Sequence, residues 1–154
     1  MLKKNIQIQL EKILLTLWVG GMWFAGYVVV PILFQSLDRK MAGMVAGQVF
    51  TVTAYIGLIS GLALFASLVF IRPAGKFGHP RHWVLLGMIA LILTGQLVLQ
   101  PMMSALKQTG LVEGSQAVAE FGHLHGISSI LYLVNSLLGL GLVIFGLRSP
   151  VQGS

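Results

Sequence analysis

The segment from Trp83 to Ser104 reads WVLLGMIALILTGQLVLQPMMS and contains no charged side chain. A helix that crosses the roughly 30 Å hydrocarbon layer of a bilayer needs about 20 mainly apolar residues, and this segment has that length. Its apolar residues do not alternate with polar ones, as the strands of a membrane β-barrel do. The segment therefore predicts a transmembrane helix.

Three further segments have the same apolar character and also lack Asp, Glu, Lys and Arg: Ile13 to Phe34, Val49 to Ile71 and Gly126 to Leu147. A charge at the centre of a membrane helix costs about 2.5 to 3.5 kcal/mol, which explains why charges are excluded. We therefore predict an all-α integral membrane four-helix bundle that forms a single domain over residues 1–154. The connections predicted between the spans are too short for a separate catalytic domain, and no fixed-period repeat is visible.

The composition agrees with a membrane protein, because 56% of the residues are hydrophobic and 9% are charged, against about a quarter charged in soluble proteins. The net charge of +6 is not gathered on one exposed domain, so we expect no nucleic-acid partner. The expected partner is the lipid bilayer. The chain has no cysteine, which excludes disulfides and thiolate chemistry.

Basic residues are distributed unevenly between the two ends of the predicted bundle. The more basic end carries Lys3, Lys4, Lys12, Arg72, Lys76, Arg81 and Arg148, and the other end carries Arg39, Lys40 and Lys107. Cytoplasmic loops of membrane proteins hold an excess of Lys and Arg. The distribution therefore predicts that both termini are cytoplasmic.

Uncharged polar side chains concentrate towards the outer end of the predicted bundle. On the fourth span they share one helix face by their i, i+3, i+4 and i+7 spacing, and two glutamines lie one turn apart on the third span. Unpaired amides in hydrocarbon cost several kcal/mol, so these groups are expected to face the bundle. They either hydrogen-bond between helices or line an outward-facing ligand pocket. The predicted ligand-binding residues are His125, Ser128, Ser129, Tyr132, Asn135, Gln96 and Gln100.

Gly57 and Gly61 are one turn apart in the middle of the second span. Small residues let membrane helices approach closely, so these two are the predicted helix-packing residues. The seam that they form lies either inside one chain or between two chains of a homodimer. A structural or assembly role through such helix contacts is one alternative function.

The residues that common enzymes require are missing. There is no P-loop, no G-x-S-x-G motif and no pair of carboxylates in the spans, so we expect no enzymatic activity and no cofactor. His123 and His125 are two positions apart and point in different directions on a helix. The spacing H-E-x-x-H is absent, and no metal site is predicted.

Three motifs carry a resemblance to a known family: WVGGMWF at 18–24, AGMVAGQVF at 42–50 and FGHLHGISS at 121–129. Together they resemble the transmembrane protein 205-like family of small four-helix membrane proteins, which in bacteria is a domain of unknown function. Phe121, His125, Gly126, Ser128 and Ser129 fit its pattern F-x-x-x-H-G-x-S-S. The family often has an asparagine soon afterwards. Here Tyr132 stands at one such position and Asn135 follows three residues later.

The resemblance implies a multi-pass protein of the bacterial inner membrane without an established activity. The W-x-G-G of the first span is more distantly similar to copper-resistance proteins and to four-helix protoporphyrinogen oxidase, which use a membrane-embedded histidine. That similarity supplies a second alternative, a haem or metal protein using His125 with His123, although the first span holds no histidine. The leading hypothesis is a non-enzymatic protein that binds or passes a small molecule through the outer-facing polar pocket.

Overall fold

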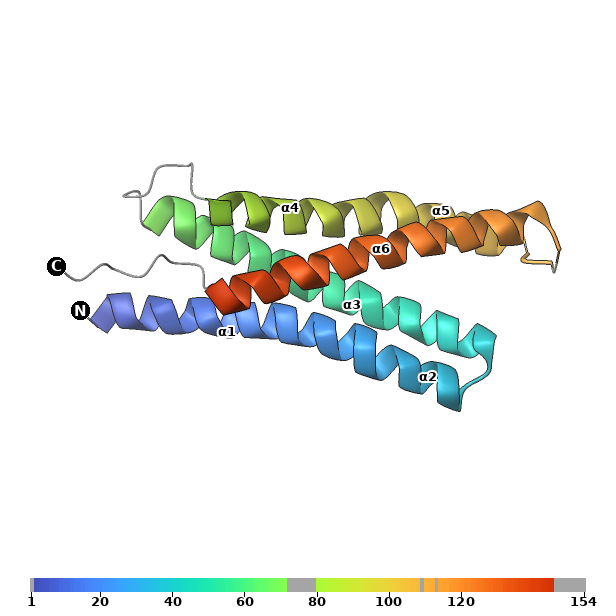
Figure 1. Cartoon of the computed structure of the whole chain (residues 1–154), viewed down its shortest axis with the longest axis horizontal. Helices are drawn as coiled ribbons and strands as arrows, with labels where there is room; N and C mark the ends of the chain where they lie inside the picture. Colours follow the sequence, from blue (N-terminus) through green and yellow to red (C-terminus); the bar gives the residue numbers. More distant parts are fainter. Residues whose placement is uncertain (1, 72–79, 109, 113, 146–154) are drawn as a thin grey trace.

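The computed structural model describes residues 2–71, 80–108, 110–112 and 114–145, which form long helices arranged side by side (Figure 1). Three of these helices pass through a π-helical segment, marked η. In chain order the segments are α1 (Leu2–Phe24), η1 (Ala25–Val29), α2 (Val30–Ser36), α3 (Arg39–Ala66), η2 (Ser67–Ile71), α4 (Pro80–Thr94), η3 (Gly95–Leu99), α5 (Gln100–Gln108) and α6 (Gln116–Phe145).

The described part of the chain contains four continuous helical stretches that are long and apolar enough to cross a membrane, which confirms the predicted fold at that level. They are Asn5–Ser36, Arg39–Val69, Arg81–Gln108 and Gln116–Phe145. The shortest has 28 residues, so at 1.5 Å per residue it is about 42 Å long. The helices therefore extend beyond the predicted apolar stretches. Gly146 and Leu147 of the predicted fourth span, and Arg72, Lys76 and Arg148 of the charge comparison, lie outside the described residues.

The first two long helices are joined by a turn much shorter than the predicted connection from Gln35 to Gln48. Leu37 is extended, and α3 begins directly after Asp38. The Asp38 carboxylate accepts hydrogen bonds from the backbone N–H groups of Lys40 and Met41 at 3.1 and 3.0 Å. Such a cap satisfies the free donors of a helix N-terminus and fixes where α3 starts.

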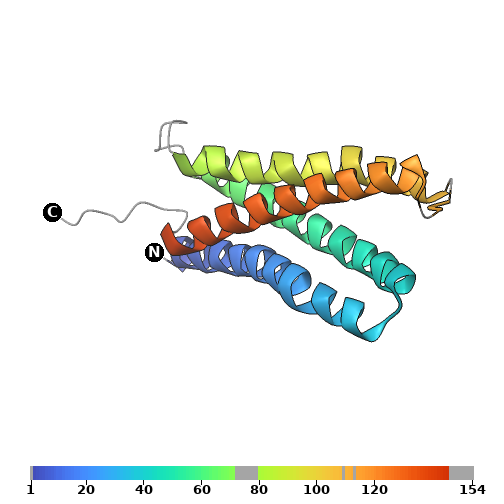
Figure 2. The ribbon, with the colours of Figure 1, turned by 45° about the vertical axis from the view of Figure 1, so that its right-hand side comes forward.

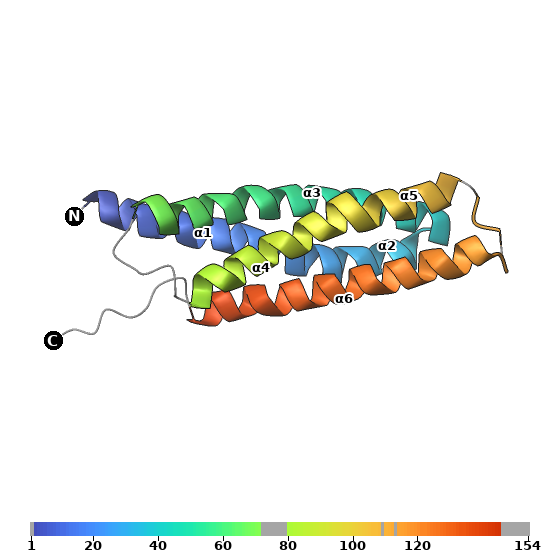
Figure 3. The ribbon, with the colours of Figure 1, turned by 90° about the horizontal axis from the view of Figure 1, so that it is seen from above.

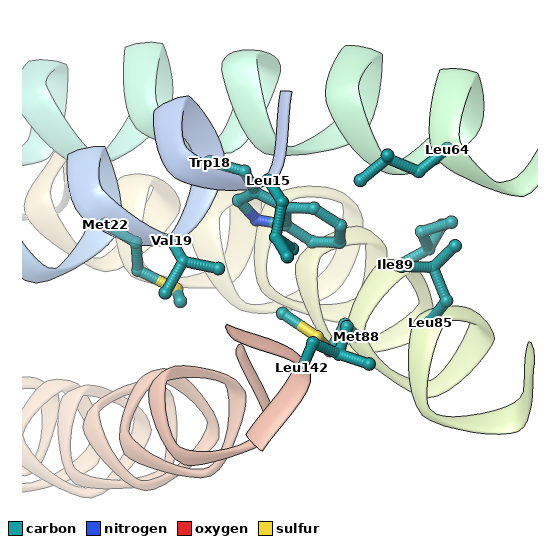
Figure 4. Close-up of a cluster of buried hydrophobic side chains, with 9 residues drawn as sticks. All are labelled: Leu15, Trp18, Val19, Met22, Leu64, Leu85, Met88, Ile89 and Leu142. Carbon is teal, nitrogen blue, oxygen red and sulfur yellow. The ribbon is translucent and has the colours of Figure 1, made fainter. Parts of the chain in front are cut away.

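The four long helices form a ring in which each packs on two neighbours: α1 on α3 and α6, and α4 on α3 and α6. Figure 3 shows the α4 and α6 ends side by side. Away from the termini the two hairpins separate, so that α2 and α3 diverge from α5 and α6 (Figures 1 and 2). The buried apolar core therefore lies in the half of the bundle nearer the termini, with side chains from all four helices (Figure 4).

Trp18 is the largest side chain of this core and is 1% exposed. A Cβ atom at Gly57 would lie 2.6 Å from the indole Nε1, and one at Gly61 would lie 2.9 Å from the indole ring. Both glycines are buried. They therefore sit in the seam between α1 and α3 of a single chain, where the indole occupies the space that side chains would take.

The two hairpins are built on a common plan. The π-helical segment η1 begins at Ala25, and η3 begins 70 positions later at Gly95. Trp18 faces Gly61 in the first hairpin, and Met88, 70 positions after Trp18, faces Gly139 in the second, where an added Cβ would lie 3.0 Å from Val19 and 3.2 Å from the Met88 methyl. The offset of 70 positions holds for the first helix of each hairpin and relates packing positions, not residue types.

A proline follows each of these two π-helical segments, Pro31 after η1 and Pro101 after η3. Proline has no N–H, and its ring clashes with the carbonyl four residues earlier in a regular helix. In both helices the residue before proline donates its N–H to the carbonyl five residues back, from Val30 to Ala25 and from Gln100 to Gly95. The wider turn lets each helix continue past its proline.

The glycine seam predicts a stability effect within one chain. Gly61→Leu should lower the free energy of unfolding by about 1–3 kcal/mol or more, because the new side chain must displace Trp18. Gly20→Leu is the matched control, since no atom lies within 4 Å of an added Cβ at that position. Denaturation by sodium dodecyl sulfate in mixed micelles measures both. Unchanged monomer stability together with loss of a crosslinked dimer in Gly61→Leu would place the seam between chains instead.

Candidate functional site

The Tyr132 side chain of α6 joins the backbone of α1 at the point where that helix becomes π-helical. Its hydroxyl donates a hydrogen bond to the Met22 carbonyl and lies against Gly26. In a regular α-helix the carbonyl of Met22 would accept directly from the N–H of Gly26. The phenol is inserted against α1 at the two residues that such a bond joins, next to the point where the π-helical segment begins.

Gly26 makes this insertion sterically feasible. A Cβ atom at this position would lie 2.5 Å from Tyr132 Cε1 and 2.9 Å from its hydroxyl oxygen. Real Cβ atoms do not approach other atoms so closely, so any larger residue would push the phenol away from α1. The pairing of Gly26 with Tyr132 therefore controls the contact between α1 and α6.

Asn135 lies one turn further along α6 and is 4% exposed. Its Nδ2 donates to the thioether sulfur of Met22 over 3.6 Å, and sulfur is a weak acceptor. Its Oδ1 is buried and has no hydrogen-bond partner within the described part of the chain. A buried acceptor without a partner costs about 1–3 kcal/mol. Asn135 is therefore a polar group that the protein itself leaves half satisfied.

The neighbouring polar groups are satisfied by helix contacts. Ser136 donates its hydroxyl to the carbonyl of Tyr132 at 2.8 Å, within α6. The Trp23 indole N–H donates to the carbonyl of Ser136 at 3.2 Å, which ties α1 to α6. The Ser136 hydroxyl and the Trp23 indole therefore form hydrogen bonds within or between helices, whereas the Asn135 Oδ1 has no partner within the described part of the chain.

Aromatic rings surround the outer side of this polar group. The Tyr132 ring meets Phe50 of α3 edge-on at 5.0 Å and Tyr27 at 6.4 Å, and Trp23 lies 5.0 Å from Tyr27. Tyr27 is 43% exposed. Tyr27 on α1 and Tyr132 on α6 lie nearer than Met22 and Asn135 to the end where the hairpins diverge. We call the five residues Trp23, Tyr27, Phe50, Tyr132 and Asn135 the central site.

The other predicted ligand residues of α6 lie nearer its start. His125 and Ser129 are exposed, and Ser128 is half-buried. The Ser129 hydroxyl bonds to the His125 carbonyl of its own helix at 2.9 Å. The His125 ring stacks on Phe121 with a centroid distance of 6.1 Å. His123 is also exposed, and no group of three acidic or histidine residues that could hold a metal ion occurs among the described residues.

Gln96 in η3 and Gln100 at the start of α5 are half-buried. Neither amide makes a side-chain hydrogen bond within residues 2–71, 80–108, 110–112 and 114–145. In this region α5 and η3 pack on α6 through an apolar cluster built on Leu99, Met103 and Leu124. Of the predicted ligand residues, the structure thus brings Tyr132 and Asn135 together with α1.

Sequence reasoning missed a second polar cluster near the N-terminus. Glu11 is buried in α1, and the Ser67 hydroxyl of η2 donates to its carboxylate at 2.6 Å. Gln7 donates its amide N–H to the Ser67 hydroxyl at 2.9 Å. The i, i+4 spacing of Gln7 and Glu11 was a usable signal, because it places both on one face of a helix that starts before the predicted span.

These features define a small all-α chain whose described part contains four helices of membrane-spanning length. The chain belongs to the family described as Domain of unknown function (DUF4149), whose sequence model matches residues 13–111. A protein of Aquifex aeolicus described as an uncharacterized protein is 33% identical over 132 residues, which cover 85% of this chain and 89% of that protein. No solved structure matches the chain.

The contact between Gly26 and Tyr132 predicts a coupled stability effect. Gly26→Ala should lower the free energy of unfolding by about 1–3 kcal/mol through overpacking, whereas Gly21→Ala should not, because its added Cβ meets no atom within 4 Å. In the Tyr132→Ala background the cost of Gly26→Ala should largely disappear. A double-mutant cycle in mixed micelles measures this coupling. Additive effects of the two substitutions would contradict the direct contact.

Proposed function

We propose that the chain is a multi-pass protein of the bacterial inner membrane, of the transmembrane protein 205-like type, with both termini in the cytoplasm. Large apolar side chains are exposed on every long helix, among them Ile59, Leu97, Ile144 and Phe145. Such a surface suits lipid and not water. The excess of basic residues near the termini supports the orientation, and the three sequence motifs support the family type.

The orientation predicts a simple labelling pattern, because the chain has no natural cysteine. In intact spheroplasts a membrane-impermeant maleimide should label Lys40→Cys, in the first turn of α3. It should label Lys3→Cys only after the membrane has been opened. Labelling of Lys3→Cys in intact spheroplasts, with Lys40→Cys labelled only after the membrane is opened, would contradict cytoplasmic termini.

Within that membrane protein, we propose that the central site binds a small apolar molecule that carries one O–H or N–H donor. The observation that carries the proposal is the buried, unpaired Oδ1 of Asn135. A donor on a ligand would remove the cost of that unpaired acceptor. The surrounding aromatic rings would contact the apolar body of the same molecule.

The ligand is proposed to enter from the outer end, where the two hairpins diverge (Figure 2). Tyr27 is the most exposed of the aromatic residues at the central site, which suits a residue at the entrance. His125, Ser128, Ser129, Gln96 and Gln100 are proposed to contact the molecule on its way in. The role is binding or passage and needs no catalytic group.

Asn135→Leu separates this proposal from a purely structural role. Leucine has the same number of side-chain heavy atoms and the same branching at Cγ as asparagine but no polar atom, so it removes the buried acceptor while the position stays filled. With 2-naphthol as the probe and 2-methoxynaphthalene as its counterpart without a donor, the wild type should bind the naphthol about tenfold more tightly, equivalent to one hydrogen bond of about 1.4 kcal/mol. Quenching of tryptophan fluorescence in detergent micelles measures both affinities.

The preference for 2-naphthol should vanish in Asn135→Leu and persist in Thr94→Ala, whose hydroxyl bonds within its own helix and belongs to no proposed site. Equal binding of the two probes by the wild type would contradict the proposed site. A preference that survives in Asn135→Leu would contradict the role of its carbonyl oxygen.

A further inference from the structure

Arg81 lies in the first turn of α4, at the end of the bundle opposite the entrance proposed above. Its Nη2 donates to the carbonyl of Phe145 at 3.0 Å and so caps the C-terminal end of α6. Its Nη1 is buried and has no hydrogen-bond partner within the described part of the chain. One arm of the guanidinium is therefore used for structure, and the other lacks an acceptor.

Arg81 also lines a groove of about 300 Å³ between α4 and α6, whose helix ends lie side by side in Figure 3. The rest of the lining is apolar: Val84, Leu137, Leu138, Gly141, Leu142 and Phe145. An apolar groove with a cation at its end suits a molecule with an acidic head and a hydrocarbon tail. It does not suit a free inorganic anion, which would gain nothing from the apolar walls.

The first hairpin has a different residue, in different surroundings, at the position that corresponds to Arg81. Glu11 stands 70 positions before Arg81, the same offset that relates η1 to η3. Glu11 is 6% exposed and accepts a hydrogen bond from Ser67 of the same hairpin. In the first hairpin the Ser67 hydroxyl therefore serves the Glu11 carboxylate. In the second, Arg81 contacts a backbone carbonyl and lines an open groove.

The Arg81 end of the groove lies close in sequence to an exposed tryptophan. Trp83 lies two residues from Arg81 and is 66% exposed. Exposed tryptophans of membrane helices favour the interface between headgroups and hydrocarbon. Arginine is well suited to pair with phosphate, because its planar fork presents several donors at once.

We infer that this groove binds one anionic phospholipid, with its phosphate paired to Arg81 and one acyl chain lying along Val84, Leu138 and Leu142. The phosphate supplies the acceptor that Nη1 lacks after a small rotation of the guanidinium. The inference is independent of the central site, because it involves the other end of the bundle and none of the same residues.

The experiment uses the full chain in detergent micelles with dioleoyl phosphatidylglycerol as the anionic probe and dioleoyl phosphatidylcholine as the neutral one. Native mass spectrometry measures the lipid that stays bound. The wild type should retain phosphatidylglycerol at least tenfold more than phosphatidylcholine. Arg81→Gln should lose that preference, and Lys107→Gln, which removes an exposed charge at the far end of the bundle, should keep it.

Gly141→Leu tests the groove without changing the cation. Gly141 lines the groove, and an added Cβ there meets no atom within 4 Å, so a leucine at this position is expected to occupy part of the groove. This variant should lose phosphatidylglycerol while its unfolding midpoint stays near that of the wild type, which decides the matter even if Arg81→Gln fails to fold. Equal retention of the two lipids by the wild type would overturn the inference. So would undiminished phosphatidylglycerol binding in Gly141→Leu, or binding of inorganic phosphate that displaces the lipid.

Discussion

The hydrogen bond from the Tyr132 hydroxyl to the Met22 carbonyl ties the last helix to the first where α1 passes into η1. In hydrocarbon no water is present to satisfy a backbone group that leaves the helical ladder. The helix passes Pro31 through a wider turn, in which the Val30 N–H donates to the Ala25 carbonyl, and the Tyr132 hydroxyl bonds to the helix just before that turn. Gly26 has no Cβ atom and so leaves space for the Tyr132 ring. The position of Asn135 beside Met22 then follows from the same contact, because it lies one turn from Tyr132 on α6.

The two hairpins share the proline, the π-helical turn and a large core side chain opposite a glycine, and they differ where function is proposed. The first hairpin places Tyr27 and Phe50 against Tyr132 of the second. Near the termini, the first hairpin buries Glu11 under Ser67, whereas the second leaves Arg81 at an apolar groove. A common framework thus carries different polar groups at the two places where an apolar ligand and a lipid are proposed to bind.

The apolar segments were sufficient to predict four helices, because segments such as Trp83–Ser104 have no charge and the right length. The helix ends were not predictable from hydropathy, since Asp38 starts α3 by capping and the first turns of that helix are partly polar. The face shared by Tyr132 and Asn135 follows from helical spacing, but their partner helix does not. Which helix lies opposite depends on a tyrosine fitting onto Gly26, and neither residue has a sequence signal that identifies the other. For Gln96 and Gln100 the sequence pattern was visible and the expected contact is missing. The two amides lie on one helix face, yet they bond to no other described side chain.

The proposed function depends on the unpaired carbonyl oxygen of Asn135, and the carbonyl resonance of this residue can be observed directly. Asn135 and the exposed Asn5 are its two asparagines, so selective ¹³C labelling of asparagine gives two side-chain carbonyl resonances, one of them an internal control. Addition of 2-naphthol to the protein in micelles should shift the Asn135 carbonyl resonance and leave that of Asn5 in place, whereas 2-methoxynaphthalene should shift neither in this way. An Asn135 resonance that does not respond, or that responds equally to both compounds, would contradict the account.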